Sequence, residues 1–204
     1  SAKRGALLFF QSVDDRGAGC ATCHSGDFFT DEQFHVLALP QVGPGKEDGR
    51  FHDDFGRFRE SGKPVDLYAF RTPTLLNVEV TGPYGHDGAY ATLKGIVQHH
   101  LNPARAVAVY DVTELDPAVQ KQYLAFNTQR ALSKLEENRK AGLPAIQNIK
   151  LTDQQVNDIT SFLLTLTDPC VKSLACLTPW IPSDDDIDPD GLRLKARMLT
   201  SVAR

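Results

Sequence analysis

The chain has 204 residues, a hydrophobic fraction of 41% and a formal net charge of -4. This length suits one large domain or two small ones, each with a buried core. No apolar run approaches the ~18 residues that a membrane-spanning helix needs, so we expect no membrane span. Without a basic block, nucleic acid is also excluded as an expected partner.

The N-terminal segment combines a predicted helix with a cysteine motif. Residues 2–10 have the pattern of an amphipathic helix, with apolar Leu7, Leu8 and Phe10. The motif Cys20-Ala21-Thr22-Cys23-His24 follows after a short loop. C-x-x-C-H is the attachment pattern of haem c: each thiol adds to one vinyl group, and the histidine becomes the first axial ligand of the iron.

A bare C-x-x-C also occurs in zinc sites and in thioredoxin-like redox pairs. A zinc site needs a second pair of ligands at close spacing, and Cys170 and Cys176 are distant and not in a C-x-x-C. A thioredoxin motif follows a strand and does not require His24. We therefore predict one covalent haem c, and with it a periplasmic or otherwise exported bacterial protein whose Ser1 begins a mature or trimmed chain.

Residues 27–91 are rich in Gly, Pro, Asp and aromatic residues and show little helical period, so they predict a long ordered loop region. Loops of this length inside a compact domain are usually functional. Within it, the glycines and proline around His86 predict a tight turn. This spacing leaves three roles open for His86: an iron ligand, a distal acid/base, or a residue that stabilises the turn.

Residues 92–167 are predicted to be helical. Thr92 caps a first helix. Pro117 to Lys140 has good helix formers with apolar Tyr123, Phe126 and Leu135, and glycine and proline follow it. The capping-box pattern at Thr152-Asp153-Gln154-Gln155 opens a further helix. That helix buries Val156, Ile159, Phe162, Leu163 and Leu166 and stops at Asp168-Pro169.

The last segment, residues 169–204, is expected to be an irregular extension. Cys170 and Cys176 either close a small disulfide loop or remain free thiols; an exported protein favours the disulfide. The acidic cluster from Asp184 to Asp190 lacks the spacing of a calcium loop and is interpreted as a solvated tail.

The second axial ligand decides what a haem here can do. The only methionine, Met198, lies in the C-terminal tail, so histidines are the better candidates. On the helix that follows Thr92, His100 shares an apolar stripe with Leu93, Ile96 and Val97, whereas His99 is turned about 100° away and is expected at an edge or in solvent. His35 and His52, in loop-rich surroundings, are expected to contact haem propionates or solvent.

Two segments carry a resemblance to a known family. They are Phe70-Arg71-Thr72-Pro73-Thr74-Leu75-Leu76-Asn77-Val78 and Thr81-Gly82-Pro83-Tyr84-Gly85-His86-Asp87-Gly88 with Thr92-Leu93. They resemble the bacterial dihaem cytochrome c peroxidases and the related MauG proteins, and Phe29 to Gln41 resembles the segment after the haem motif in the second haem domain of that family. The similarity runs from about residue 3 to residue 168. It implies a mainly α, cytochrome c-like haem domain with long ordered loops.

The resemblance also implies roles for individual residues. The second haem domain of the family has its distal ligand fourteen residues after the histidine of the Pro-Tyr-x-His turn, which is the position of His100. It further implies that backbone carbonyls of Thr81 and Pro83 help to hold calcium, and that Arg71, Pro83 and Tyr84 contact the cofactor. The usual arginine of the family is replaced by Leu76.

We therefore expect residues 1–168 to relay electrons to or from a peroxide-activating haem in a second haem domain or chain, with a further redox partner protein. The isolated chain is then an electron-transfer unit of a peroxidase-like enzyme.

Two alternatives stay open: a self-contained monohaem peroxidase in which His86 is the acid/base at an open iron, or a simple monohaem electron carrier. The family has two haem motifs and this sequence has one, which fits a fragment, a separate partner chain or a single-haem relative.

Overall fold

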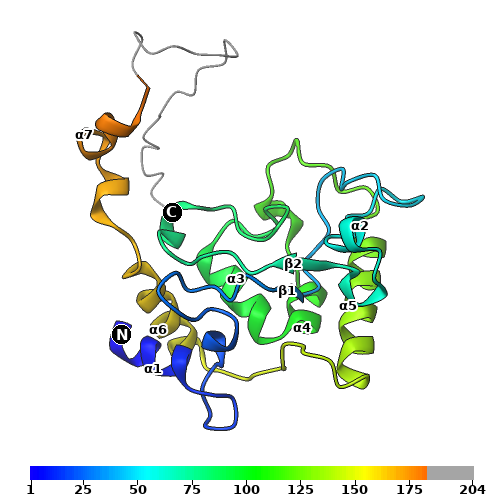
Figure 1. The fold of residues 1–204 in the computed structure, drawn as a ribbon, viewed down its shortest axis with the longest axis horizontal. Helices are drawn as coiled ribbons and strands as arrows, with labels where there is room; N and C mark the ends of the chain where they lie inside the picture. Colours follow the sequence, from blue (N-terminus) through cyan, green and yellow to red (C-terminus); the bar gives the residue numbers. More distant parts are fainter. Residues whose placement is uncertain (183–204) are drawn as a thin grey trace.

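The computed structural model describes residues 1–182; Met198 and the acidic cluster from Asp184 to Asp190 lie outside this range. The predicted mainly α fold is confirmed, with one small antiparallel sheet (Figure 1). The helices are α1 (Ala2–Phe10), α2 (Phe58–Ser61), α3 (Leu93–Leu101), α4 (Pro103–Ala108), α5 (Leu124–Lys140), α6 (Asp153–Leu164) and α7 (Leu174–Leu177). The strands are β1 (Phe34–Val36) and β2 (Ala69–Arg71), paired with Phe34 opposite Arg71. Six short 3-10 turns, η1 (Cys20–Thr22), η2 (Pro64–Asp66), η3 (Val78–Val80), η4 (Val112–Glu114), η5 (Pro169–Lys172) and η6 (Thr178–Trp180), complete the described elements.

The first helix packs closely against α6, and Figure 1 shows the two side by side. Gly5 is at the point of closest approach: a Cβ there would lie 1.9 Å from the carbonyl oxygen of Asp158. The buried face of α1 is formed by Gly5 and Phe9, whereas Leu7 and Phe10 are 67% and 56% exposed. The apolar residues of α1 thus extend beyond its buried face, because the face is set by the close contact at Gly5.

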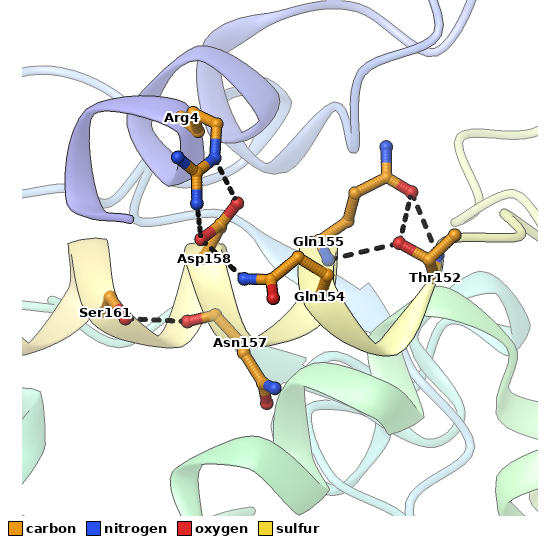
Figure 2. A network of polar contacts seen from close by, with 7 residues as sticks. All are labelled: Arg4, Thr152, Gln154, Gln155, Asn157, Asp158 and Ser161. Carbon is orange, nitrogen blue, oxygen red and sulfur yellow. Dashed lines mark hydrogen bonds and ion pairs between the residues drawn. The ribbon is translucent and has the colours of Figure 1, made fainter.

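A polar network joins the same two helices (Figure 2). The Arg4 guanidinium of α1 donates Nε and Nη2 hydrogen bonds of 2.7 and 2.9 Å to the Asp158 carboxylate of α6. Gln154 donates a further hydrogen bond of 3.1 Å to Asp158. The capping box predicted at the start of α6 is present, with reciprocal bonds between Thr152 and Gln155.

Helix α3 completes this half of the molecule by packing on α6, and its Thr92 cap is formed as predicted. The core between α1, α3 and α6 contains Phe9, Leu93, Leu101, Val156 and Ile159. Cys20 and Ala21 of η1 pack against this core, so the cysteine motif is held by the same helices.

A second core lies between α5 and the two strands. It contains Leu135 and Ala131 of α5 and Val36 and Tyr68 from the loop region. Helix α5 begins at Leu124, later than the predicted Pro117, because Tyr123 at its N-cap has a left-handed φ of 61° that no helix interior adopts.

The predicted loop region, residues 27–91, is ordered by buried polar contacts. Asp53 is fully buried, and its Oδ2 accepts hydrogen bonds of 2.8 Å from Tyr68 and 2.6 Å from Arg130. The contact with Arg130 joins this loop to α5. Burying a carboxylate is unfavourable without such partners, so the network holds the loop in one conformation.

The C-terminal segment forms an arm that extends away from the helical body in Figure 1. It contains η5, α7 and η6 and a disulfide between Cys170 and Cys176, the arrangement favoured from the sequence. Lys172 joins it to the body through an ion pair of 2.6 Å with Glu79. Over residues 1–182, none of the helices has the length and apolar character required to cross a membrane.

Candidate haem site

The cysteine motif forms a tight turn. Gly19 precedes it in a left-handed conformation with φ of 62°, and η1 carries Cys20. The backbone N–H of His24 donates to the Cys20 carbonyl at 2.9 Å. Burial raises the pKa of the Cys20 thiol to about 12. The turn therefore holds both cysteines and His24 in one compact segment, as attachment of haem c requires.

The ring of His24 has a defined orientation. Its Nδ1 lies 3.0 Å from the Phe29 carbonyl oxygen, which only accepts hydrogen bonds, so Nδ1 carries the hydrogen and Nε2 keeps its lone pair. Burial, with a smaller contribution from His100, lowers the pKa of His24 to about 4. The imidazole is therefore neutral at physiological pH, the form in which histidine binds a metal.

His100 lies opposite His24. Its Nδ1 donates to the carbonyl of Ile96, one turn earlier in α3, at 2.8 Å. The remaining Nε2 is therefore the lone-pair nitrogen here too. The two ring centroids are 6.5 Å apart with an interplanar angle of 57°. The structure thus brings together the two histidines that the sequence selects as axial ligands.

His99 differs from its predicted position. It is fully buried, not at an edge or in solvent. Its Nε2 lies 2.8 Å from the Leu37 carbonyl oxygen, and its Nδ1 lies 2.8 Å from the Tyr90 hydroxyl. The prediction was wrong because it considered only the apolar stripe of α3, whereas the loop at Leu37 covers the other side of that helix. In the sequence, only its position next to His100 set His99 apart, and nothing indicated its contacts with Leu37 and Tyr90.

His86 lies in the expected tight turn, closed by paired backbone hydrogen bonds of 2.8 and 3.0 Å between Tyr84 and Tyr90. Its ring stacks on Phe70 with the centroids 3.6 Å apart. Both ring nitrogens are buried and have no hydrogen-bond partner among the described residues. Burial, with a smaller contribution from Lys46, lowers the pKa of His86 to about 4, so the ring is neutral.

The other candidate residues have less specific surroundings. Thr81 and Pro83 are exposed, and Tyr84 donates its hydroxyl to the Val78 carbonyl at 2.9 Å. Arg71 is exposed on β2.

Another metal-ligand cluster adjoins the haem motif. Within residues 1–182, only Cys23, Asp31 and His35 place three potential metal-ligand atoms within 4.8 Å of one another. A Cys23 thioether would belong to haem attachment, so these residues adjoin the haem motif and do not form a separate site. His35 bonds to Asp31 at 2.8 Å, and the exposed His52 stacks on Tyr123.

Several known proteins are similar in sequence to this chain. No protein-family model matches the chain. The methylamine utilization protein MauG of Methylophilus methylotrophus is 33% identical over 141 residues, which are 68% of this chain and 34% of that protein. Cytochrome-c peroxidase IdrP1 of Denitromonas iodatirespirans is 28% identical over 206 aligned residues, 90% of this chain and 44% of that protein.

Solved structures agree with these relatives. A variant of the dihaem peroxidase BthA from Burkholderia thailandensis superposes with a TM-score of 0.54 at 25% identity, over 82% of this chain and 42% of that chain. A MauG-like protein associated with microbial copper homeostasis shares the fold, with a TM-score of 0.56 at 24% identity, over 88% and 47% of the two chains.

The chain belongs to the MauG and dihaem cytochrome c peroxidase family. This is a family of haem peroxidases and electron-transfer proteins, in agreement with the cysteine motif. The chain spans between a third and a half of the length of the MauG and peroxidase relatives compared above.

Proposed function

We propose that residues 1–168 form the electron-relaying haem c domain of a MauG- or peroxidase-type oxidoreductase. In this proposal Cys20 and Cys23 bind the haem covalently, and His24 and His100 are its axial ligands. One observation carries the proposal: the ring centroids of His24 and His100 lie 6.5 Å apart, and both Nδ1 atoms are hydrogen-bonded to backbone carbonyls.

The separation of the rings supports a shared iron. A metal–nitrogen bond of histidine is about 2 Å long. Two such bonds on opposite sides of one iron, with half of each imidazole ring, place the ring centroids roughly 6 Å apart. The separation of His24 and His100 therefore fits one bis-histidine iron without movement of α3 or of the cysteine turn.

The haem supplies a one-electron ferric–ferrous couple, and two imidazole ligands favour a lower potential than a histidine–methionine pair. With His24 and His100 both bound to it, the iron would have no position left for peroxide. The backbone carbonyls of Phe29 and Ile96 fix the tautomer of each ligand and make it more basic. This arrangement suits electron relay and not peroxide activation.

The peroxide-activating centre is then in a second haem domain or chain, and a redox protein is the external partner. Support comes from BthA, which is a dihaem peroxidase, and from the length of the relatives, which exceeds that of this chain. On family resemblance alone, we assign calcium binding between the two haem domains to the carbonyls of Thr81 and Pro83. On the same basis we assign cofactor contacts to Arg71, Pro83 and Tyr84. An exported location agrees with the Cys170–Cys176 disulfide.

The monohaem peroxidase alternative needs His86 as an acid/base in contact with peroxide. The burial of both its ring nitrogens and its stacking on Phe70 make this role less favourable. The simple electron carrier uses the same ligands as the proposal and differs only in having one haem per purified particle.

Replacement of His100 by alanine tests the proposal. We expect the His100→Ala holoprotein to change from low-spin to mainly high-spin ferric haem, because one axial position opens. Low-temperature EPR with haem quantitation measures the spin state and the haem count together. His52→Ala, an exposed histidine replaced in the same way, is expected to keep the wild-type spectrum. An unchanged low-spin spectrum in His100→Ala would refute ligation by His100, and peroxide turnover by the wild-type chain alone would favour the peroxidase alternative.

A further inference from the structure

His99, the residue before the candidate ligand, is held on both sides by hydrogen bonds. It is 0% exposed, its Nε2 lies 2.8 Å from the Leu37 carbonyl oxygen and its Nδ1 lies 2.8 Å from the Tyr90 hydroxyl. Leu37 is 62 residues away along the chain. The contacts therefore attach α3 to a distant loop at the position next to His100.

The partners determine the tautomer of His99. A carbonyl oxygen only accepts, so Nε2 carries the hydrogen and donates it to Leu37. The lone pair is then on Nδ1, which accepts the hydrogen bond from the Tyr90 hydroxyl. Both ring nitrogens are satisfied, so His99 has no nitrogen available for an iron, in contrast to His100.

This two-sided contact also limits how α3 can turn about its axis. Successive residues of a helix are 100° apart, so a rotation that moves His99 moves His100 by the same angle. The Nδ1–H of His100 bonds only to Ile96 of the same helix, and this bond cannot fix the helix relative to His24. Next to His100, two sets of polar contacts join α3 to distant parts of the described chain. One is the backbone hydrogen bond of 2.7 Å from the Ile149 N–H to the Leu101 carbonyl at the end of the helix. The other is the Tyr90–His99–Leu37 pair, which is made by a side chain and holds the helix on two sides.

We propose that His99 is a positioning residue for the haem: the Tyr90–His99–Leu37 hydrogen bonds set the orientation of the His100 ring relative to His24. This inference rests on the proposed ligation by His24 and His100. The orientation of two axial imidazole planes sets the splitting of the iron d orbitals, which the g values of a low-spin haem report. Groups that orient a metal ligand typically change metal affinity or activity 10–100-fold when they are removed.

Two variants remove parts of the contact in the holoprotein. Tyr90→Phe deletes one hydroxyl and keeps the ring, and His99→Leu deletes both hydrogen bonds. We expect both to bind one haem per chain and to remain low-spin, with shifted g values and a shifted midpoint potential. We also expect cyanide to displace His100 about 10-fold faster than in the wild type. His99→Gln can still donate to Leu37 and accept from Tyr90, so we expect it to restore part of the wild-type signature.

Tyr110→Phe is the matched control. Tyr110 packs on Tyr90 with the ring centroids 5.4 Å apart, but its hydroxyl donates to the Ala89 carbonyl and not to His99. We expect this variant to keep the wild-type g values, potential and cyanide rate.

The outcomes separate the two proposals. If His100→Ala opens the iron but Tyr90→Phe and His99→Leu leave the g values, the potential and the cyanide rate unchanged, the positioning role is wrong and the ligation stands. If His100→Ala leaves the spectrum unchanged, the ligation itself is wrong. Should His99→Leu fail to fold, Tyr90→Phe alone decides, since it removes a single oxygen atom.

Discussion

Two adjacent, largely buried residues, His86 and Asp87, are short of hydrogen-bond partners. Asp87 Oδ2 accepts from the backbone N–H of Val42 at 2.8 Å, but its Oδ1 and both nitrogens of His86 have no partner among the described residues. A cavity of about 20 Å³ adjoins them, lined by Gln41, Val42, Gly43, Gly45, His52, Asp54, His86 and Asp87. This volume is large enough for one water molecule.

Burial raises the pKa of Asp87 to about 7, although backbone amides, among them that of Val42, oppose the shift. The charged and titratable groups that face the pair are Lys46, His52, Asp54, Tyr90 and Tyr110. An unfolded aspartate has a pKa of about 3.9, so the folded protein binds the extra proton between pH 4 and pH 7. The contribution of Asp87 to stability is thus fully present below pH 4 and is lost as the pH rises to 7.

We predict that Asp87→Asn removes this pH dependence. Relative to the variant, the wild-type free energy of unfolding should fall by up to about 1.4 kcal/mol for each pH unit between pH 4.5 and 6.5. Urea unfolding of both holoproteins at several pH values measures the difference. Asp14→Asn, at an exposed position, serves as control. Parallel pH curves for wild type and Asp87→Asn would contradict the prediction.

Among the elements, α1 and α6 depend on each other most directly. The Arg4–Asp158 ion pair combines an Asp158 side chain that is 3% exposed with an Arg4 side chain that is 63% exposed. The hydrogen bond and charge of Arg4 lower the pKa of Asp158. Stability from this pair is therefore present above about pH 4, and it is lost as the pH falls below that value.

We predict a larger coupling free energy for Arg4–Asp158 than for an ion pair within one helix whose carboxylate is exposed. Double-mutant cycles with alanine measure the coupling, and Lys134–Glu137 of α5, at 3.6 Å with Glu137 68% exposed, is the matched comparison. The bidentate geometry and the buried carboxylate are the reasons for the difference. Equal coupling in the two cycles would show that α1 is held on α6 by apolar contacts alone.

The helix starts were predicted correctly where the cap forms within a single turn. Thr92 and Thr152 form the expected caps because their hydroxyls bond within the same turn. The pattern failed before Tyr123, where residues with good helix propensity adopt other conformations. Propensity is a weak prior that tertiary contacts override.

The residues of the candidate site also fall into two groups: those that local patterns predict and those that depend on distant contacts. The Cys20–His24 motif is contiguous, and His100 follows from a helix period together with a family spacing. The burial of His99 could not be predicted, because its partner Leu37 is 62 residues away and has no pattern that links it to α3. Contacts between distant loops and helices therefore account for most of what the sequence did not indicate.

At the scale of the whole molecule, the C-terminal arm is only loosely joined to the helical body. Beyond the junction itself, the described polar contact between them is the Lys172–Glu79 ion pair. On the body side of the junction, the Asp168 N–H donates to Asn77 Oδ1 at 2.8 Å. The Cys170–Cys176 disulfide lies wholly within the arm. The predicted division at residue 168 stays a prediction, which the stability of the arm can test.

We predict that replacing both Cys170 and Cys176 by serine leaves the main thermal transition and the haem spectrum unchanged. A disulfide within the cooperative unit typically contributes 2–4 kcal/mol, which would lower the Tm by several degrees. Calorimetry and optical spectroscopy of the holoprotein provide the measurement. Protease cleavage of the arm should become faster in the variant, which confirms that the disulfide was present. A Tm decrease of several degrees would place the arm inside the cooperative unit.

The contact between Arg4 and Asp158 has a consequence for the order of assembly. It joins residues 154 positions apart, with the haem motif directly after the N-terminal partner. Contacts of such sequence separation form late in folding, so there is an interval in which the exported chain carries the motif but α6 is not yet packed on α1. The thiols of Cys20 and Cys23 therefore remain on an open chain in that interval, when the enzymes that attach haem can reach them, and the arrival of α6 closes the domain.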